Sequence, residues 1–280
     1  MAVGSRLACR GLCSPAKRAG TAGGQDILSE ILADPSALLI FVLIGFAAQL
    51  VDGALGMAFG QISSTILISI GVPPAAASAG VHTAETFTTA VSGISHVAHR
   101  NVDWSLFVRI AVPGVIAGVL GAYTLTQIDA DVARPFVLSY LTALGLYLFY
   151  RGAMHRHTER RPKIVEPLGA IGGFLDAAGG GGWGAIVTSN LLVQGSNPRK
   201  TIGTVNTAEF FLTVTISATF IVALGWEAFT IATTGLLIGG VMAAPFGAWI
   251  AKRVNPDTLL TFVGALVTLT SGFALYRALA

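Results

Sequence analysis

The sequence predicts an all-α integral membrane protein made of two homologous, inverted repeats, and three observations lead to this prediction. Apolar residues make up 53% of the chain and charged residues 11%, with a mean hydropathy of +0.72. A soluble domain carries about 25% charged residues. Apolar runs recur at roughly the length that crosses a hydrocarbon core of about 30 Å. Finally, residues 45–87 and 169–211 match without a gap at a constant offset.

The repeat aligns glycines, prolines and acids. The matched positions are Gly45 with Gly169, Asp52 with Asp176, Gly56 with Gly180, Gly60 with Gly184, Gly71 with Gly195, Pro74 with Pro198, and Thr83-Ala84-Glu85 with Thr207-Ala208-Glu209. Repeated halves with glycine-interrupted apolar segments are typical of secondary transporters, whose site lies between the halves.

Each half is expected to contain five apolar segments. In the first half they cover 36–55, 57–70, 75–98, 105–127 and 134–151, and in the second half 164–178, 183–194, 198–223, 229–251 and 257–279. In each half, the first segment ends at a glycine-rich break and the second is too short to span the membrane as a straight helix. Each short segment is therefore predicted to be half of a broken helix or of a re-entrant hairpin. The remaining three segments in each half have the length of full spans.

The domain organisation follows from these segments. Residues 1–30 form a basic tail that is expected to be disordered, residues 31–151 the first repeat, 152–163 a basic cytoplasmic loop, and 164–280 the second repeat. Ten alternating crossings then place Arg100, Arg199-Lys200 and Lys252-Arg253 in the cytoplasm, and Asp129, Asp131 and Glu227 outside. The two halves thereby enter the membrane in opposite senses. The basic tail would lie outside, against the positive-inside rule, so eight crossings with two re-entrant segments is the alternative.

The two glycine breaks are the first candidate site. Glycine costs about 1 kcal/mol per position in a helix interior, so these runs should open the helix. The freed amides and the N-terminus of the next half-helix would form an anion cradle. Close helix packing is the alternative explanation for the glycines. The predicted substrate-binding residues are Gly53, Gly56, Gly60, Gln61, Ser64, Gly179, Gly180, Gly181, Gly182, Trp183, Gly184, Thr188, Asn190, Asn206 and Thr207.

Acids and histidines form the second candidate group, assigned to proton coupling or gating. Asp52 and Asp176 each precede a break, where a carboxylate could cap the following half-helix, accept a proton or hold a cation. In segment 75–98, polar residues fall on one helical face, namely Ser78, His82, Glu85, Thr89, Ser92 and His96. Such a face is expected to line a water-filled path or to bond other polar helices. The same register in the second half retains Asn206, Glu209 and Thr213 but ends in apolar residues.

Several function classes are excluded or disfavoured. We find no nucleic-acid motif, phosphate loop, dinucleotide fingerprint or nucleophile motif, so neither an enzyme nor a nucleotide-binding protein is predicted. His82-x-x-Glu85 lacks an accompanying His or Cys cluster, and we expect neither a metal nor a cofactor. Cys9 and Cys13 lie in the tail and form no disulfide framework.

The chain resembles the TauE/SafE family of sulfite exporters and related permeases over about residues 36–280. The telling runs are GGFLDAAGGGGWGAIVTSNLL, NPRKTIGTVNTAEFF and their first-half counterparts. The resemblance implies a multi-pass inner-membrane protein that exports sulfite, sulfonates or similar small anions. Asp52, Asp176, Glu85 and Glu209 depart from the family's broad pattern and suggest a distinct branch. Protons are the expected coupling ion. A passive anion channel and a transporter of another organic anion are the alternatives, and homo-oligomerisation is left open.

Overall fold

The protein is an all-α membrane protein, described by a computed structural model over residues 35–153, 162–225, 231–251 and 256–279. The helices are α2 (Pro35–Leu55), α3 (Phe59–Ser69), α4 (Pro74–Ala98), α5 (Trp104–Thr126), α6 (Ala130–Ala153), α7 (Glu166–Gly179), the π-helix η1 (Gly184–Thr188), α8 (Ser189–Val193), α9 (Pro198–Leu224), α10 (Ile231–Ala251) and α11 (Pro256–Leu279). Five elements therefore stand in the first half and five in the second, if η1 and α8 are taken together. The tail of residues 1–30, most of the loop 152–163, Glu227 and Lys252-Arg253 lie outside the described residues.

The predicted segments agree with these helices, and local signals explain several boundaries. Asp103 caps α5, since its Oδ1 accepts hydrogen bonds from the amides of Ser105 and Leu106. Asn197 caps α9 in the same way. Four helices are long and apolar enough to cross a membrane by length and composition, within α5, α6, α9 and α11. Helix α6 begins earlier than the predicted 134, because Pro135 is accommodated inside its first turns.

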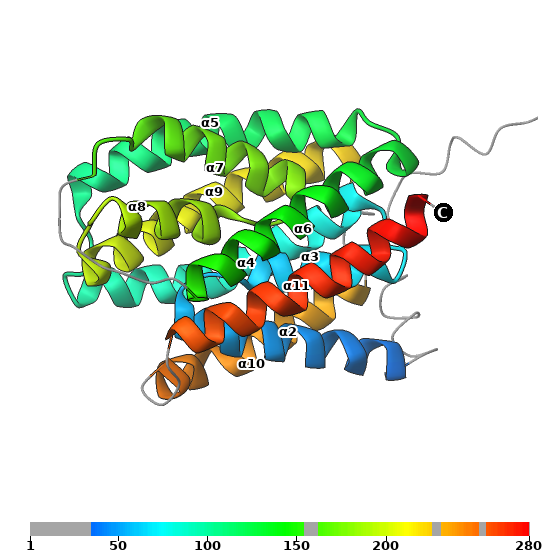
Figure 1. The fold of residues 1–280 in the computed structure, drawn as a ribbon, viewed down its shortest axis with the longest axis horizontal. Helices are drawn as coiled ribbons and strands as arrows, with labels where there is room; N and C mark the ends of the chain where they lie inside the picture. Colours follow the sequence, from blue (N-terminus) through cyan, green and yellow to red (C-terminus); the bar gives the residue numbers. More distant parts are fainter. Residues whose placement is uncertain (1–34, 154–161, 226–230, 252–255, 280) are drawn as a thin grey trace, which may run out of the picture.

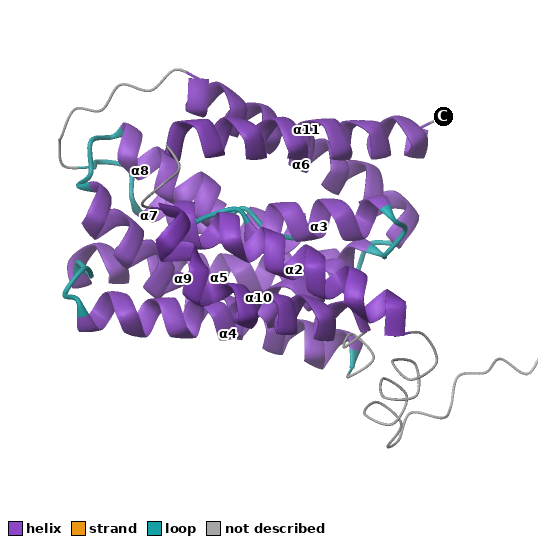
Figure 2. Ribbon diagram, turned by 90° about the horizontal axis from the view of Figure 1, so that it is seen from below, coloured by secondary structure: helices purple, strands orange, loops and turns teal. Residues whose placement is uncertain are grey.

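Equivalent helices of the two halves pack against each other in opposite directions. Gly145 of α6 lies against Thr268 of α11, and Gly152, further along α6, lies against Thr261. The antiparallel pair α6–α11 runs along one edge of the molecule (Figure 2). The pair α4–α9 is antiparallel as well, because the end of α4 meets the start of α9 near Asn101 and Gly203. Because equivalent helices of the two halves run antiparallel, the halves are related by a two-fold axis perpendicular to the helices. The repeats are therefore inverted, as the sequence predicts.

The halves also exchange helices. Helix α2 packs along α10, and its counterpart α7 packs along α5. Both contacts are parallel and use glycines, because small residues let two backbones approach closely. In the first contact Gly235 and Gly239 of α10 lie against α2, and in the second Gly173 lies against the carbonyl of Gly114. Each half therefore needs the other to cover its first helix.

The short elements form two hairpins that enter from opposite ends. Both ends of α7–α8 lie together, since the Gln194 Oε1 atom accepts hydrogen bonds from the amides of Lys163 (2.9 Å) and Ile164 (2.8 Å). The ends of α2–α3 lie at the other end of the molecule, where the start of α2 adjoins the start of α10 and α10 adjoins Gly80 near the start of α4. Each short segment therefore belongs to a hairpin that returns to the end where it begins, as expected for the re-entrant alternative. The pairs α2–α3 and α7–α8 turn back at their glycine breaks, whereas α4, α5, α6, α9, α10 and α11 are uninterrupted helices of 21 to 27 residues (Figure 1).

Basic residues gather at one end, which we name the basic end. There the Lys200 Nζ atom donates to the Arg100 carbonyl at 2.8 Å, and the Arg199 Nε atom donates to Asn101 Oδ1 at 2.7 Å. These contacts bring together side chains that the sequence placed on one side of the membrane. Asp129 and Asp131 precede and begin α6 at the opposite end. The described loop charges thus follow the predicted asymmetry.

The exchanged contact at Gly173 yields a stability prediction. We expect Gly173→Ala to lower the thermal unfolding temperature, because the added Cβ would overlap the Gly114 backbone and overpacking costs about 1–3 kcal/mol. Gly272→Ala in α11 is the matched control, since its Cβ would meet only the Thr142 Cγ2 atom at 3.8 Å. Equal unfolding temperatures for the two variants in detergent would contradict the close packing of α5 and α7.

Candidate functional site

The two hairpin tips touch each other in the middle of the molecule. A Cβ atom on Gly60 would lie 2.8 Å from the Cα of Gly181, and one on Gly184 would lie 2.8 Å from the Cβ of Met57. The Ser64 hydroxyl donates to the Gly180 carbonyl across this contact. The predicted glycines of both breaks therefore converge, and side chains larger than hydrogen are excluded at the contact.

Each break is bridged by the aspartate that precedes it. The Asp52 Oδ1 atom accepts a hydrogen bond from the Phe59 amide at 3.3 Å, and the Asp176 Oδ1 atom accepts one from the Trp183 amide at 2.8 Å. Both bonds span seven residues, so the two halves use the same device. The carboxylate satisfies a free amide at the start of the second half-helix, which is the capping role considered from the sequence.

The second aspartate has an additional partner. The His82 Nε2 atom lies 3.0 Å from Asp176 Oδ2, and both side chains are buried. The His82 Nδ1 atom lies 2.7 Å from the Ser78 carbonyl, and the Ser78 hydroxyl donates to the Ala177 carbonyl at 2.8 Å. Helix α4 is thereby bonded to the tip of the second hairpin. At the equivalent place in the other half, Asn206 donates to the Ile202 carbonyl of its own helix.

Two further acids complete the predicted group. Glu85 and Glu209 are 6% and 8% exposed. The Gly60 backbone hydrogen-bonds the Glu85 carboxyl, and Glu209 lies within electrostatic range of Glu85, Asp52 and Asp176. The structure thus brings all five predicted acid and histidine residues into one cluster around the hairpin tips.

A cavity of about 480 Å³ reaches the first break from the basic end. Its polar lining comes from α2, the C-terminal half of α4 and α9. These residues are Gln49, Asp52, Thr88, Ser92, Ser95, His96 and Asn206. Gly53 and Gly56 also line it, so the first break is open to this space. The polar stripe of α4 is therefore divided. Its end near His96 faces the cavity, whereas Ser78, His82, Glu85 and Thr89 are buried among other helices.

The remaining predicted binding residues are placed differently. Trp183 is fully buried, and its indole donates to the Val205 carbonyl at 3.2 Å. Asn190 and Thr207 donate to carbonyls of their own helical segments. Gln61 and Thr188 are buried, and their Oε1 and Oγ1 atoms have no hydrogen-bond partner within the described ranges. Gly179 and Gly182 lie against the ring of Tyr140. None of these residues lines the cavity at the first break.

Sequence reasoning missed two features of the tips. The Tyr140 hydroxyl donates to the Gly181 carbonyl at 3.1 Å, yet this tyrosine lies in an apolar helix outside the matched repeat segments. The second break also continues into a π-helix over Gly184–Thr188. Single π-helical turns are rare and are found frequently at functional sites. Within the described part of the chain, three or more His, Cys, Asp or Glu side chains do not gather as metal ligands do.

Comparisons with known proteins give a consistent family. The family model described as sulfite exporter TauE/SafE matches residues 41–274. The chain is 42% identical over 243 residues to the "Probable membrane transporter protein YtnM" of Bacillus subtilis (strain 168), covering 84% of this chain and 81% of that protein. It is 22% identical over 111 residues to "Sulfite exporter TauE/SafE family protein 3" of Arabidopsis thaliana, covering 40% of this chain and 23% of that protein. No solved structure gave a significant match.

Proposed function

This chain belongs to the sulfite exporter TauE/SafE family, and we propose that it is a secondary transporter that exports small sulfur-containing anions, such as sulfite or organosulfonates, across the inner membrane. The contact between the two hairpin tips carries this proposal. Glycine-broken segments from inverted halves that meet in mid-membrane are the usual setting of a transport site. An enzymatic role has no support among the motifs of the sequence.

The anion is placed at the first break. There the cavity of about 480 Å³ gives access from the basic end, and Gln49, Ser92 and Asn206 supply neutral polar groups. At both breaks two amides already donate to the aspartate, those of Gly56 and Phe59 to Asp52 and those of Gly181 and Trp183 to Asp176. Only the first break lines this cavity. The second break is therefore assigned to gating and proton handling, and only the first to direct substrate contact. This narrows the binding set expected from the sequence.

Charge in the tip cluster favours proton coupling. Four carboxyl groups, on Asp52, Glu85, Asp176 and Glu209, lie around the hairpin tips. Among the described residues of this cluster, the His82 imidazole, which contacts Asp176, is the one group that can carry a positive charge. Ionised carboxylates that are buried together without equal positive charge are very costly, and they would also repel an anion. Protons must therefore occupy some of these groups when the anion binds. Movement of the anion would then be linked to movement of protons.

The placement of the cavity supports alternating access as the mechanism. It opens the first break toward the basic end, which positive loop charges assign to the cytoplasm. On the other side of the tips, Ile68 of α3 and Leu138 of α6 are each 1% exposed and close the route. The described conformation is thus open to one side, and release to the other side would require α3 and α6 to separate.

Cysteine accessibility tests this open side. In a variant with Cys9 and Cys13 replaced by serine, Ser95→Cys should react with an impermeant thiol reagent added from the basic end, because Ser95 lines the cavity. Ile68→Cys should stay unreactive toward reagent added from the basic end in the absence of substrate, because Ile68 is buried on the other side of the tips. Rapid labelling of Ile68→Cys with slow labelling of Ser95→Cys would contradict the assignment.

Flux into proteoliposomes tests the function itself. Sulfite, thiosulfate, sulfoacetate, taurine and sulfate should be compared at equal ionic strength, with and without an imposed pH gradient. We expect saturable flux of at least one sulfur anion that responds to the gradient. Flux that does not saturate and ignores the gradient would instead support a passive anion channel, the alternative that shares these features. Preference for a carboxylate over every sulfur anion would support a transporter of another organic anion.

A further inference from the structure

A second cavity lies at the end opposite the basic end. It has a volume of about 820 Å³ and is formed by the end of α3, the start of α6 and the end of α11. Arg134 from α6 and Arg277 from α11 line it, and Asp131 is the one acid among its lining residues. The charged residues of the lining therefore leave a net positive charge. The sequence singled out neither arginine.

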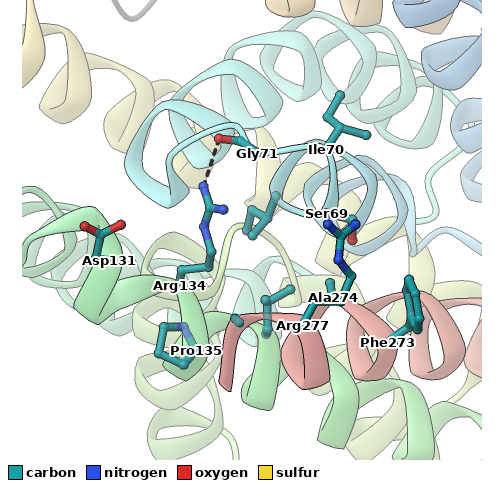
Figure 3. Close-up of a pocket in the computed structure, with 12 residues that line it drawn as sticks. Ser69, Ile70, Gly71, Asp131, Arg134, Pro135, Phe273, Ala274 and Arg277 are labelled. Carbon is teal, nitrogen blue, oxygen red and sulfur yellow. Dashed lines mark hydrogen bonds between the residues drawn. The ribbon is translucent and has the colours of Figure 1, made fainter. Parts of the chain in front are cut away.

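The two arginines approach the same loop from different helices (Figure 3). The Arg134 Nη2 atom donates to the Gly71 carbonyl at 2.8 Å, which anchors the guanidinium at the loop between α3 and α4. Gly71 has a φ of 108°, in the left-handed region that glycine favours. The Arg134 Nε atom is buried and has no hydrogen-bond partner within the described ranges. A guanidinium has five N–H donors, so this anchored group keeps donors for a ligand.

Apart from Ser69, the rest of the lining is apolar. Ile68 and Leu138 form the floor, and Pro135 and Phe273 belong to the walls. Positive charge beside apolar walls is costly unless an acceptor pairs with it. Guanidinium groups pair best with planar or tetrahedral oxyanions, which accept several hydrogen bonds at once.

We propose that this cavity is a second anion site, which holds an oxyanion, such as a sulfate, sulfonate or phosphate group, between Arg134 and Arg277. It differs chemically from the first break, since the binding groups are guanidinium donors and not backbone amides. The oxyanion has two sources. It is either a free anion in solution or the phosphate of an anionic lipid, because the large aromatic side chains of Phe136, Phe273 and Tyr276 beside the cavity are 73%, 64% and 70% exposed and could contact acyl chains. The proposal does not depend on the transported substrate.

The first arm of the test uses free anions. Delipidated full-length protein in detergent is titrated with sodium sulfate and, separately, with sodium phosphate, against sodium chloride at constant ionic strength, and thermal unfolding is followed. A ligand that binds the folded state raises its apparent stability. We expect saturable stabilisation of the wild type, with a half-saturating concentration that rises about tenfold or more in Arg134→Gln/Arg277→Gln. Arg109→Gln is the control, since Arg109 is an exposed arginine paired with Glu166 near the basic end.

The second arm uses lipid. Native mass spectrometry compares retention of phosphatidylglycerol and phosphatidylcholine by the wild type and by the double variant. Selective phosphatidylglycerol binding that the double variant loses assigns the site to a lipid phosphate. A response to sulfate or phosphate without selective lipid binding assigns it to a free anion.

Equal responses of wild type and double variant to all three probes overturn the proposal. If the double variant fails to fold, Arg277→Gln alone decides the matter, because Arg277 is exposed and its truncation should leave the fold intact. Arg277→Lys keeps the positive charge but loses the paired N–H donors of the guanidinium group. It should therefore bind the anion more tightly than Arg277→Gln does.

Discussion

Proteoliposomes that contain the Gly181→Leu variant should show no anion flux above protein-free vesicles. Gly181 has a φ of 132°, which L side chains rarely adopt, and a Cβ there would lie 2.5 Å from the carbonyl carbon and 2.7 Å from the Cα of Gly60. A leucine side chain must therefore push the two hairpin tips apart. This would disrupt the contact between the tips, which is the proposed gate, and would deform the first break, which is the proposed anion site.

A smaller change separates loss of transport from loss of folding. Gly60→Ala adds one methyl group at the same contact, 2.8 Å from the Gly181 Cα, and should reduce flux by about tenfold at an overpacking cost of about 1–3 kcal/mol. Gly93→Ala is its control in α4, where the added Cβ would make an ordinary 3.5 Å contact with the Thr207 Cα. If Gly60→Ala and Gly93→Ala transport equally well, the tip contact is not a gate.

Replacing Asp176 by alanine should destabilise the protein more than the same change at Asp52. Loss of Asp176 leaves the Trp183 amide and the His82 imidazole without their acceptor, and each unpaired buried group costs about 1–3 kcal/mol. Loss of Asp52 frees the Phe59 amide beside an open cavity, where water can replace the carboxylate. Thermal unfolding of the two variants in the same detergent measures the difference, and equal losses would contradict it.

The conservative variant addresses coupling without removing the cap. Asp176→Asn keeps an oxygen that can accept from the Trp183 amide, but the amide cannot take up a proton. We expect flux to persist at a reduced rate, by about 100-fold, and to become insensitive to a pH gradient. His82→Asn, which copies the residue found at the equivalent position Asn206, should show the same insensitivity. Normal gradient-driven flux in both variants would remove the proton role from this pair.

Much of the fold could be predicted because the membrane imposes simple rules on sequence. Apolar length marks the full spans, and the matched glycine breaks locate both hairpins. The equivalence of Asp52 with Asp176 is also visible in the repeat, and the structure gives both the same bond across the break. Such features are recorded in residue type and spacing within one segment.

Contacts between distant segments could not be predicted in the same way. Nothing in α2 indicates that its neighbour is α10, because a lipid-facing and a helix-facing apolar surface have similar composition. The number of crossings could not be decided from the sequence for a related reason, since a short apolar segment that turns back carries the same hydropathy as one that continues. Tyr140, Arg134 and Arg277 were missed because each matters only through the element on which it lies in space. The roles of Asp52 and Asp176 could not be decided from the sequence either. Each could cap a half-helix, accept a proton or hold a cation, and only the structure shows the amides that they bind.

The exchange of helices between the halves has a consequence for biosynthesis. The first hairpin lies along α10, which emerges from the ribosome only after most of the chain has been made. Until then the face of α2 that packs against α10 has no protein partner, so the early chain must be held by lipid, by the insertion machinery or by transient pairing. Neither half should survive quality control when expressed alone, whereas the two halves produced as separate polypeptides in one cell should rescue each other. Each half of the duplicated chain therefore depends on the other to fold, and folding can be completed only after the last helices have been synthesised.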